Sequence, residues 1–222
     1  MNKLVSVLLV TLLAGVLAED APPVKMDLYY ETMCPYSQDY FYSQLYPTFE
    51  ELGYIMDVNL YPYGNANYVE NDDGGYDFTC QHGPDECTGN MIHACAQKYI
   101  DDISVEMDFV YCLLAQNSPA TDGPACAAQV GVDYTPIDQC VNSVEGEEAL
   151  HAVAVQQDSL VPSVAYVPWI LVDDVYNENL NTACRINLKR VVCNHYTGPT
   201  PPECEKLEEL DQDIDVPKCF KN

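Results

Sequence analysis

The chain has few basic side chains: among its 222 residues, 9 Lys and Arg stand against 35 Asp and Glu, which gives a formal net charge of −26. A surface of this sign repels the phosphates of nucleic acids and the anionic headgroups of membranes. We therefore expect neither a nucleic-acid partner nor a membrane partner. The charge suits positively charged proteins or an acidic compartment, although it also serves simply to keep a protein in solution.

Long apolar runs are absent after residue 18. Before it, one Lys precedes an apolar run from Leu4 to Ala18, and the polar residue Glu19 follows. This order is typical of a secretory signal peptide, and the run is short for a membrane span, so a membrane anchor is the weaker alternative. We expect residues 1–18 to be removed. Their removal takes away Lys3 and no acidic residue, so the charge becomes −27.

Cysteine, in contrast, is abundant, and its number is odd: the chain has 11. In a secreted chain such cysteines form disulfides rather than metal sites. Ten can pair within the chain, and the last is free or pairs with another molecule. Ten cysteines allow roughly 945 pairings, so the connectivity stays open.

Residues 24–62 have the pattern of a strand, a helix and a second strand. Alternating residues predict strands over Val24–Tyr30 and Ile55–Pro62. Gly53 ends the helix between them, and Pro47 is expected to kink it. The apolar stripe of this helix consists of Phe41, Leu45, Phe49 and Leu52.

Cys34 stands at the start of this predicted helix, directly before Pro35 in the first turn. Unpaired N–H groups and the helix dipole lower the pKa of a thiol in that position and make it a better nucleophile. Because one cysteine is unpaired, we expect Cys34 to be the free, reactive one. An ordinary disulfide and a covalent dimer through Cys34 are the alternatives.

About a hundred residues separate the second strand from Pro168, which is far longer than a usual connection. Helices are predicted over Asn90–Ile100, Val105–Gln116 and Ala149–Gln157. We expect a helical insertion over about residues 64–163 that folds onto the side of the molecule where Cys34 lies. Six cysteines staple it: Cys80, Cys87, Cys95, Cys112, Cys126 and Cys140.

Near the C-terminus, Asn181 is predicted to cap a helix that runs to His195. In such a helix Cys184 and Cys193 lie roughly 13.5 Å apart, beyond the ~7 Å that a disulfide spans, so each is expected to have a different partner. The tail over residues 198–222 is acidic and is predicted to form a strap. Cys204 and Cys219 are expected to tie it down.

The segment from residue 80 to residue 95 resembles the signature of the gamma-interferon-inducible lysosomal thiol reductases, the GILT family. Cys34 upstream and Val167-Pro168-Trp169 downstream are also similar to that family, and the likeness runs from about residue 24 to about residue 204. The signature residues are Cys80, Gln81, His82, Gly83, Glu86, Cys87, Asn90 and Cys95. A zinc site on Cys80, His82, Cys87 and Cys95 would have suitable ligands, but the spacing matches no usual pattern, so no metal is expected.

The resemblance implies an α/β, thioredoxin-like fold with a disulfide-rich helical insertion and a C-terminal strap. It implies one domain over residues 19–222, whose thioredoxin-like core spans about residues 24–63 and 164–197. It also implies thiol–disulfide exchange at Cys34 with no cofactor. A cis-proline, Pro168, would face that sulfur and lead into a strand over Trp169–Val172. Family reductases typically carry Cys-x-x-Cys, whereas here Ser37 stands at the fourth position.

A hydroxyl at position 37 cannot attack a mixed disulfide, although it can donate a hydrogen bond to the Cys34 thiolate. We therefore expect weak or absent dithiol reductase activity. The protein would act by binding protein partners or by forming mixed disulfides with them. The alternative is an active reductase that works by a monothiol route, with glutathione or free cysteine as the resolving thiol.

The sequence contains no Asn-x-Ser/Thr acceptor for N-linked sugars and does not end in an endoplasmic-reticulum retrieval signal. Lysosomal sorting of the family's reductases depends on such sugars. Secretion to the outside of the cell is therefore the expected destination, and a lysosomal or endosomal lumen is disfavoured.

Overall fold

A computed structural model describes residues 21–72, 74–116, 120–205, 207 and 217–220. The predicted signal peptide over residues 1–18 lies outside these residues. So do residues 206, 208–216 and 221–222 of the predicted acidic strap.

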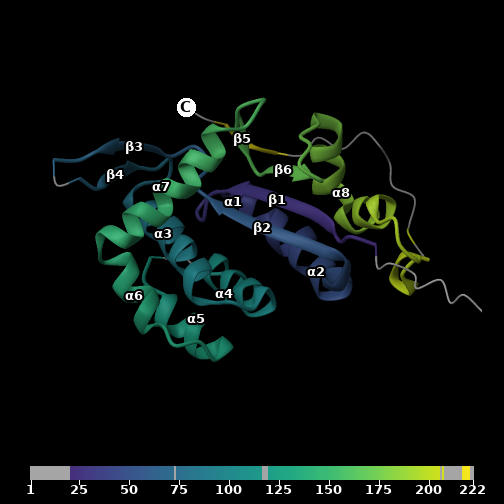
Figure 1. Cartoon of the computed structure of the whole chain (residues 1–222), viewed down its shortest axis with the longest axis horizontal. Helices are drawn as coiled ribbons and strands as arrows, with labels where there is room; N and C mark the ends of the chain where they lie inside the picture. Colours follow the sequence, from purple (N-terminus) through teal and green to yellow (C-terminus); the bar gives the residue numbers. More distant parts are fainter. Residues whose placement is uncertain (1–20, 73, 117–119, 206, 208–216, 221–222) are drawn as a thin grey trace, which may run out of the picture.

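A three-stranded sheet with the order β2-β1-β6 runs through the centre of the molecule (Figure 1). β1 (Val24–Tyr30) and β2 (Met56–Pro62) are parallel, and β6 (Trp169–Val172) is antiparallel to β1. All three were predicted from sequence and are confirmed. The register aligns two sets of residues, one for each face of the sheet: Met26, Val58 and Val172 on one, and Tyr29, Tyr61 and Trp169 on the other.

The predicted first helix is present and is interrupted by a wider turn. It consists of α1 (Pro35–Tyr40), a π-helical turn η1 (Phe41–Leu45) and α2 (Tyr46–Leu52). Pro47 has no N–H to donate to the carbonyl four residues earlier, and its ring needs extra room on that side. The π-helical turn directly before it gives this room, so the expected kink takes the form of one wide turn.

The main core lies on the Met26 face of the sheet. The stripe from Phe41 to Leu52 is buried there, together with Leu188 and Val192 of α8 (Glu178–His195). α4 (Ile103–Leu114) adds Met107 and Val110 to the same cluster. This burial of strand, first helix and last helix in one cluster is what a thioredoxin-like fold requires.

The insertion contains more structure than the sequence predicted. The three expected helices are α3 (Pro84–Tyr99), α4 and α7 (Val144–Asp158). Three further elements were missed: the hairpin of β3 (Asn67–Glu70) and β4 (Tyr76–Thr79), α5 (Gly123–Val130) and α6 (Thr135–Val141). Disulfides Cys95–Cys140 and Cys112–Cys126 cross-link these helices around a second apolar cluster. Within the described part of the chain, no helix is long and apolar enough to cross a membrane.

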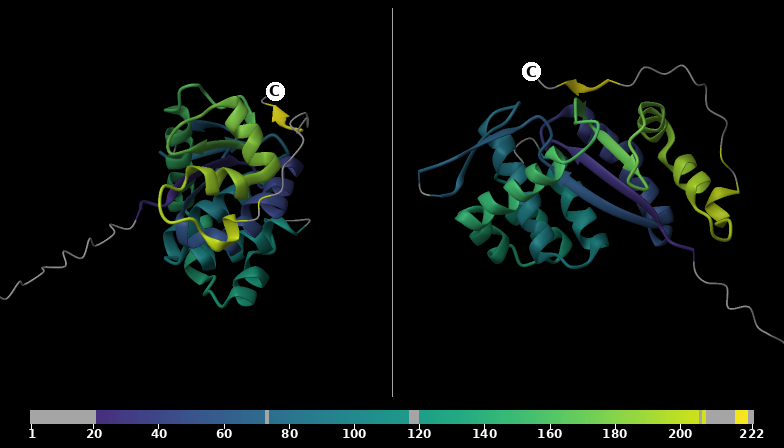
Figure 2. Two further views of the ribbon diagram at one scale, coloured as in Figure 1. Left: turned by 90° about the vertical axis from the view of Figure 1, so that its right-hand side faces the viewer. Right: turned by 45° about the horizontal axis from the view of Figure 1, so that its top comes forward.

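The end of the chain returns to the sheet region. β7 (Cys219–Phe220) pairs with β5 (Tyr166–Val167) in antiparallel orientation, and Figure 2 shows this short ribbon at one edge of the molecule. A 3₁₀ turn, η3 (Pro202–Cys204), is tied to α8 by the disulfide Cys193–Cys204. The predicted anchoring roles of Cys204 and Cys219 are confirmed.

The start of α8 differs from the prediction. Its N-cap is Asn177, whose side chain accepts from the N–H groups of Asn179 and Leu180. Asn181 is instead fully buried, and its side chain accepts from Ile170 N (2.8 Å) and donates to Tyr166 Oη (3.1 Å). Asn181 was read as a cap because Asn favours that position, but here it joins α8 to β6 and β5.

We predict that Asn181→Ala lowers the free energy of unfolding by about 1–3 kcal/mol, because it leaves the buried Ile170 N–H without its acceptor. Asn179→Ala, on the exposed side of the same helix turn, should change it by less than about 0.5 kcal/mol. Urea unfolding of both variants with the disulfides intact checks this. Equal losses for the two would contradict the joining role of Asn181.

Candidate functional site

Cys34 lies in the short loop between β1 and α1 and is the N-cap residue of α1. Pro35 occupies the first turn, as predicted, and the Cys34 carbonyl accepts the first helical hydrogen bond from Gln38 N (3.0 Å). The side chain is fully buried. The loop therefore presents the sulfur at the end of the sheet but covers it from solvent.

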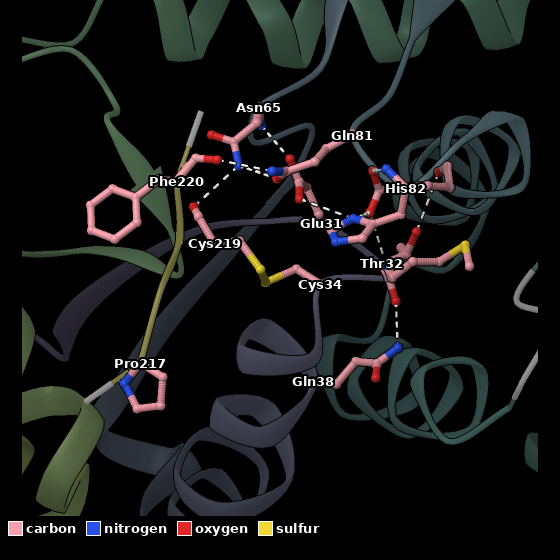
Figure 3. Close-up of a disulfide and its surroundings, with 12 residues drawn as sticks. Glu31, Thr32, Cys34, Gln38, Asn65, Gln81, His82, Pro217, Cys219 and Phe220 are labelled. Atoms are coloured by element: carbon pink, nitrogen blue, oxygen red, sulfur yellow. Dashed lines mark hydrogen bonds and ion pairs between the residues drawn. A yellow bond between two sulfur atoms is a disulfide. The ribbon is translucent and has the colours of Figure 1, made fainter. Parts of the chain in front are cut away.

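The Cys34 sulfur is bonded to Cys219, with 6.4 Å between the two Cα atoms (Figure 3). The prediction that Cys34 carries the free thiol is therefore wrong for this form of the protein. The same bond uses the sulfur that a covalent dimer through Cys34 would need. The two residues are 185 positions apart in sequence, so no local pattern pointed to their pairing.

The cysteine without a partner is Cys184. It lies fully buried in the main core beside Leu188, and this burial raises the pKa of its thiol to about 12. A thiol with such a pKa is protonated at neutral pH and is a poor nucleophile. The prediction that Cys184 and Cys193 do not pair with each other is confirmed, but the expected separate partner of Cys184 is absent.

The Val167–Pro168 peptide bond is cis, as the resemblance implies. Val167 pairs in register with Cys219, and both pack with Cys34 and Trp169 in one buried cluster. β5, the strand that leads into the cis-proline, therefore pairs with the strand that carries Cys219, the disulfide partner of Cys34.

Ser37 lies one helical turn from Cys34 and is fully buried. Its Oγ has no hydrogen-bond partner among the described residues. The predicted hydrogen bond to the sulfur of Cys34 is therefore not made while that sulfur is bonded to Cys219. In a form in which Cys34 is a thiolate, the Ser37 hydroxyl can donate this hydrogen bond.

The signature residues come together around the loop that carries Cys34. Cys80 and Cys87 form a disulfide, and Gly83 between them has a φ of +96°, which a side chain would disfavour. The Gln81 side chain accepts from Asn65 Nδ2 (2.7 Å) and donates to the Phe220 carbonyl (2.9 Å). Gln81 thus contacts the strand that contains Cys219.

Glu86 and Asn90, at the start of α3, hold the other side of this loop. Asn90 Oδ1 accepts from Thr32 N (3.0 Å) and Thr32 Oγ1 (2.9 Å). Glu86 accepts from Met33 N (3.3 Å) and, through its other oxygen, from His82 N (3.0 Å). Glu86 and Asn90 are both fully buried, so the residues directly before Cys34 are fixed by polar side chains from the insertion.

Glu31 and His82 lie close together beside the disulfide, and sequence reasoning did not find Glu31. His82 Nδ1 lies 2.6 Å from Glu86 Oε2 and 3.6 Å from Glu31 Oε2. A Glu31 oxygen, a His82 ring nitrogen and Cys219 Sγ all lie within 4.8 Å of one another. Burial, followed by the nearby charge of Glu86, raises the pKa of Glu31 to about 8.

This group can handle protons next to a reacting sulfur. Glu31 holds a proton in the neutral range, and His82 offers a ring nitrogen that donates or accepts. The zinc ligand set weighed from sequence is not available, because the sulfurs of Cys80, Cys87 and Cys95 are in disulfides. All six cysteines that were predicted to staple the insertion are in disulfides: Cys80–Cys87, Cys95–Cys140 and Cys112–Cys126.

Comparison with known proteins identifies the family. The family model for gamma interferon inducible lysosomal thiol reductase (GILT) matches residues 25–130. A gamma-interferon-inducible lysosomal thiol reductase of Carassius auratus is 35% identical over 187 residues, which cover 83% of this chain and 73% of that protein. This chain belongs to the GILT family.

Other GILT relatives are similar over comparable lengths. A gamma-interferon-inducible lysosomal thiol reductase-like protein of Anopheles gambiae is 32% identical, covering 83% of this chain and 81% of the relative. GILT-like protein 1 of Drosophila melanogaster is 30% identical, covering 85% and 81%. Among solved structures, DsbA of Chlamydia trachomatis aligns over 71% of this chain and 78% of its own, with 14% identity and a TM-score of 0.48.

We predict that the native, unreduced GILT chain carries no thiol that reacts with iodoacetamide, because its one unpaired cysteine is buried. In denaturant without reductant, one thiol should react, and peptide analysis should place the label on Cys184. Cys184→Ala should abolish that label. A label on Cys34 in the native protein would contradict the pairing described above.

We also predict that the stability of this GILT chain falls as pH rises from about 5 to about 8. Above its ordinary pKa of 4.5, the Glu31 carboxyl loses its proton in the unfolded chain, whereas the folded protein keeps that proton up to about pH 8. Unfolding is therefore favoured progressively across this window. Each unit of the pKa difference corresponds to roughly 1.4 kcal/mol.

Urea unfolding from pH 5 to pH 8 with intact disulfides measures this slope. Glu31→Gln keeps an oxygen to accept from Asn65 N and should flatten it. Glu106→Gln is a second, distant comparison. Burial raises the pKa of Glu106 to about 7, so this variant should flatten only the lower part of the window. A slope that Glu31→Gln leaves unchanged would contradict the assigned protonation of Glu31.

Proposed function

We propose that this GILT family member is a secreted thiol–disulfide exchange protein in which Cys34 is the attacking sulfur and Ser37 cannot serve as its resolving partner. It forms mixed disulfides with protein partners and has weak dithiol reductase activity. The observation that carries this proposal is that Cys34 is held in a disulfide at the N-terminus of α1, beside the cis-Pro168 peptide, with a hydroxyl at position 37.

The surroundings of Cys34 support exchange chemistry rather than an inert cross-link. A thiolate is the reactive species in exchange, and the N–H groups at a helix start favour it. Glu31 and His82 lie within 4.8 Å of the other sulfur of the bond, so the protonated carboxyl of Glu31 can give its proton to a leaving Cys219 thiolate. A cross-link with a purely structural role needs neither feature.

The proposed partners are proteins with an accessible disulfide or surface patch, and small thiols such as glutathione. A chain with nine basic and 35 acidic residues is poorly suited to nucleic acids and anionic membranes, and we propose that neither is a partner. Secretion follows in this proposal from residues 1–18, read as a signal peptide, and from the absence of glycan acceptor sites.

The second candidate is a reductase that turns over by a monothiol route, in which glutathione or free cysteine attacks the mixed disulfide. The retained cis-Pro168 element beside Cys34 favours it, since that element is dispensable for a pure binding protein. The two candidates differ in whether substrate is released repeatedly.

We predict that, with excess glutathione, the natural protein reduces a quenched disulfide peptide slowly and that Cys34→Ser abolishes the activity. Ser37→Cys restores a second thiol one helical turn from Cys34, so its rate should exceed that of the natural protein by at least about tenfold. Steady-state rates at pH 5 and pH 7 measure this. Equal background rates in the natural protein and Cys34→Ser, together with no mixed disulfide at Cys34, would contradict exchange at Cys34.

A further inference from the structure

The strand that contains Cys219 lies where another extended chain could lie. β7 adds to the free edge of β5 by antiparallel pairing, with Cys219 opposite Val167 and Phe220 opposite Tyr166. Extended peptides bind exposed strand edges by such pairing, and side chains next to the pairing give specificity. β7 therefore occupies the position that an extended partner would need in order to bring a disulfide to Cys34.

Polar contacts hold this strand on both sides of the sulfur. Asn65 Nδ2 donates to the Cys219 carbonyl (3.2 Å), and Gln81 donates to the Phe220 carbonyl, as Figure 3 shows. On the other side, Lys218 Nζ lies 2.6 Å from Glu178 Oε1 and 4.1 Å from the centre of the Tyr166 ring. Gln81 belongs to the family signature, so part of that signature serves to position the tail.

These contacts are of a kind that can break and re-form. β7 has only two residues, Phe220 is largely exposed, and the Glu178 side of its ion pair with Lys218 is half exposed. Exposed ion pairs and a two-residue ladder each contribute little stability. A strand tethered to the same chain nevertheless returns at a high effective concentration after it leaves.

No other described cysteine is placed for this role. Six cysteines are paired within the insertion, and Cys193 is paired with Cys204. Cys184 lies in the main core, whereas Cys34 and Cys219 share the separate cluster around Trp169. Cys219 is the cysteine whose sulfur reaches Cys34.

We propose that Cys219 is the resolving cysteine of this protein, delivered to Cys34 by a strand that takes the place of the substrate on β5. This inference rests on the proposed exchange at Cys34 and changes its outcome: the mixed disulfide is an intermediate that Cys219 resolves, and turnover is slow because β7 must first return to β5. It replaces the missing thiol at position 37 with one that is remote in sequence and adjacent in space.

The steps balance as follows. In the reduced protein, the Cys34 thiolate attacks a substrate disulfide, whose S–S bond breaks; one substrate thiolate leaves and takes a proton from solvent. The Cys219 thiol gives its proton to water, and its sulfur attacks Cys34 Sγ. The Cys34–substrate bond breaks, the second substrate thiol leaves, and the Cys34–Cys219 bond forms.

Two electrons have then passed from the two cysteines to the substrate. Two equivalents of a small thiol, such as glutathione, reduce Cys34–Cys219 again and become one small-molecule disulfide. The form described here is the oxidised end of this cycle.

The test uses the full mature chain with Cys34–Cys219 reduced, mixed with one equivalent of a peptide dimer that is linked by a single disulfide. Intact-mass measurement follows the peptide adduct on the protein and the released peptide thiols. The natural protein should release two peptide thiols and retain no adduct. Cys219→Ser should release one and keep a peptide on Cys34, with an adduct lifetime at least about tenfold longer.

A matched control removes the other tail cross-link without touching Cys34. The double variant Cys193→Ser/Cys204→Ser should behave as the natural protein does. A natural protein that keeps its adduct as long as Cys219→Ser would overturn the resolving role and leave exchange at Cys34 standing. Failure of both proteins to form any adduct at Cys34 would overturn the exchange function itself. The result for the natural protein decides the question even if a variant fails to fold.

Discussion

The bond between Cys34 and Cys219 is the interaction on which the rest of the site depends. It fixes the last described residues of the chain, lays β7 along β5, and closes the sulfur at the start of α1 away from solvent. It also decides which cysteine is left over. With Cys34 paired, the odd thiol is Cys184, which is buried in the main core and does not act as a nucleophile. Reactivity at Cys34 is therefore conditional on reduction of this one bond.

The family signature gains a physical meaning from the same arrangement. Glu86 and Asn90 fix the residues directly before Cys34, and Gln81 contacts the carbonyl beside Cys219. Glu86 and Asn90 belong to α3, and Gln81 lies directly before it, in the loop that the Cys80–Cys87 disulfide closes. The insertion is thus a scaffold for the two sulfurs, and the carboxyl of Glu31 is kept protonated in the neutral range because this scaffold excludes water.

Sequence reasoning succeeded where local pattern determines structure. Alternation gave β1 and β2, and helical spacing gave the long helices, because these periods follow from backbone geometry. β6 was expected from the resemblance to the family. It failed for α5 and α6, because these helices are short and each is held to the insertion by a disulfide rather than by a long apolar stripe. It also failed for Cys34–Cys219, since a pairing between residues 185 positions apart leaves no local trace. One signal for Cys184 was present, because it shares its helix face with the buried Leu188 and Val191.

Non-reducing peptide mapping of the secreted protein, digested at acidic pH so that disulfides do not rearrange, tests the central claim most directly. The account predicts one linked pair of peptides that carries Cys34 and Cys219, and an unlinked peptide that carries Cys184. A peptide in which Cys34 is free, or is linked to a second copy of the chain, would contradict it.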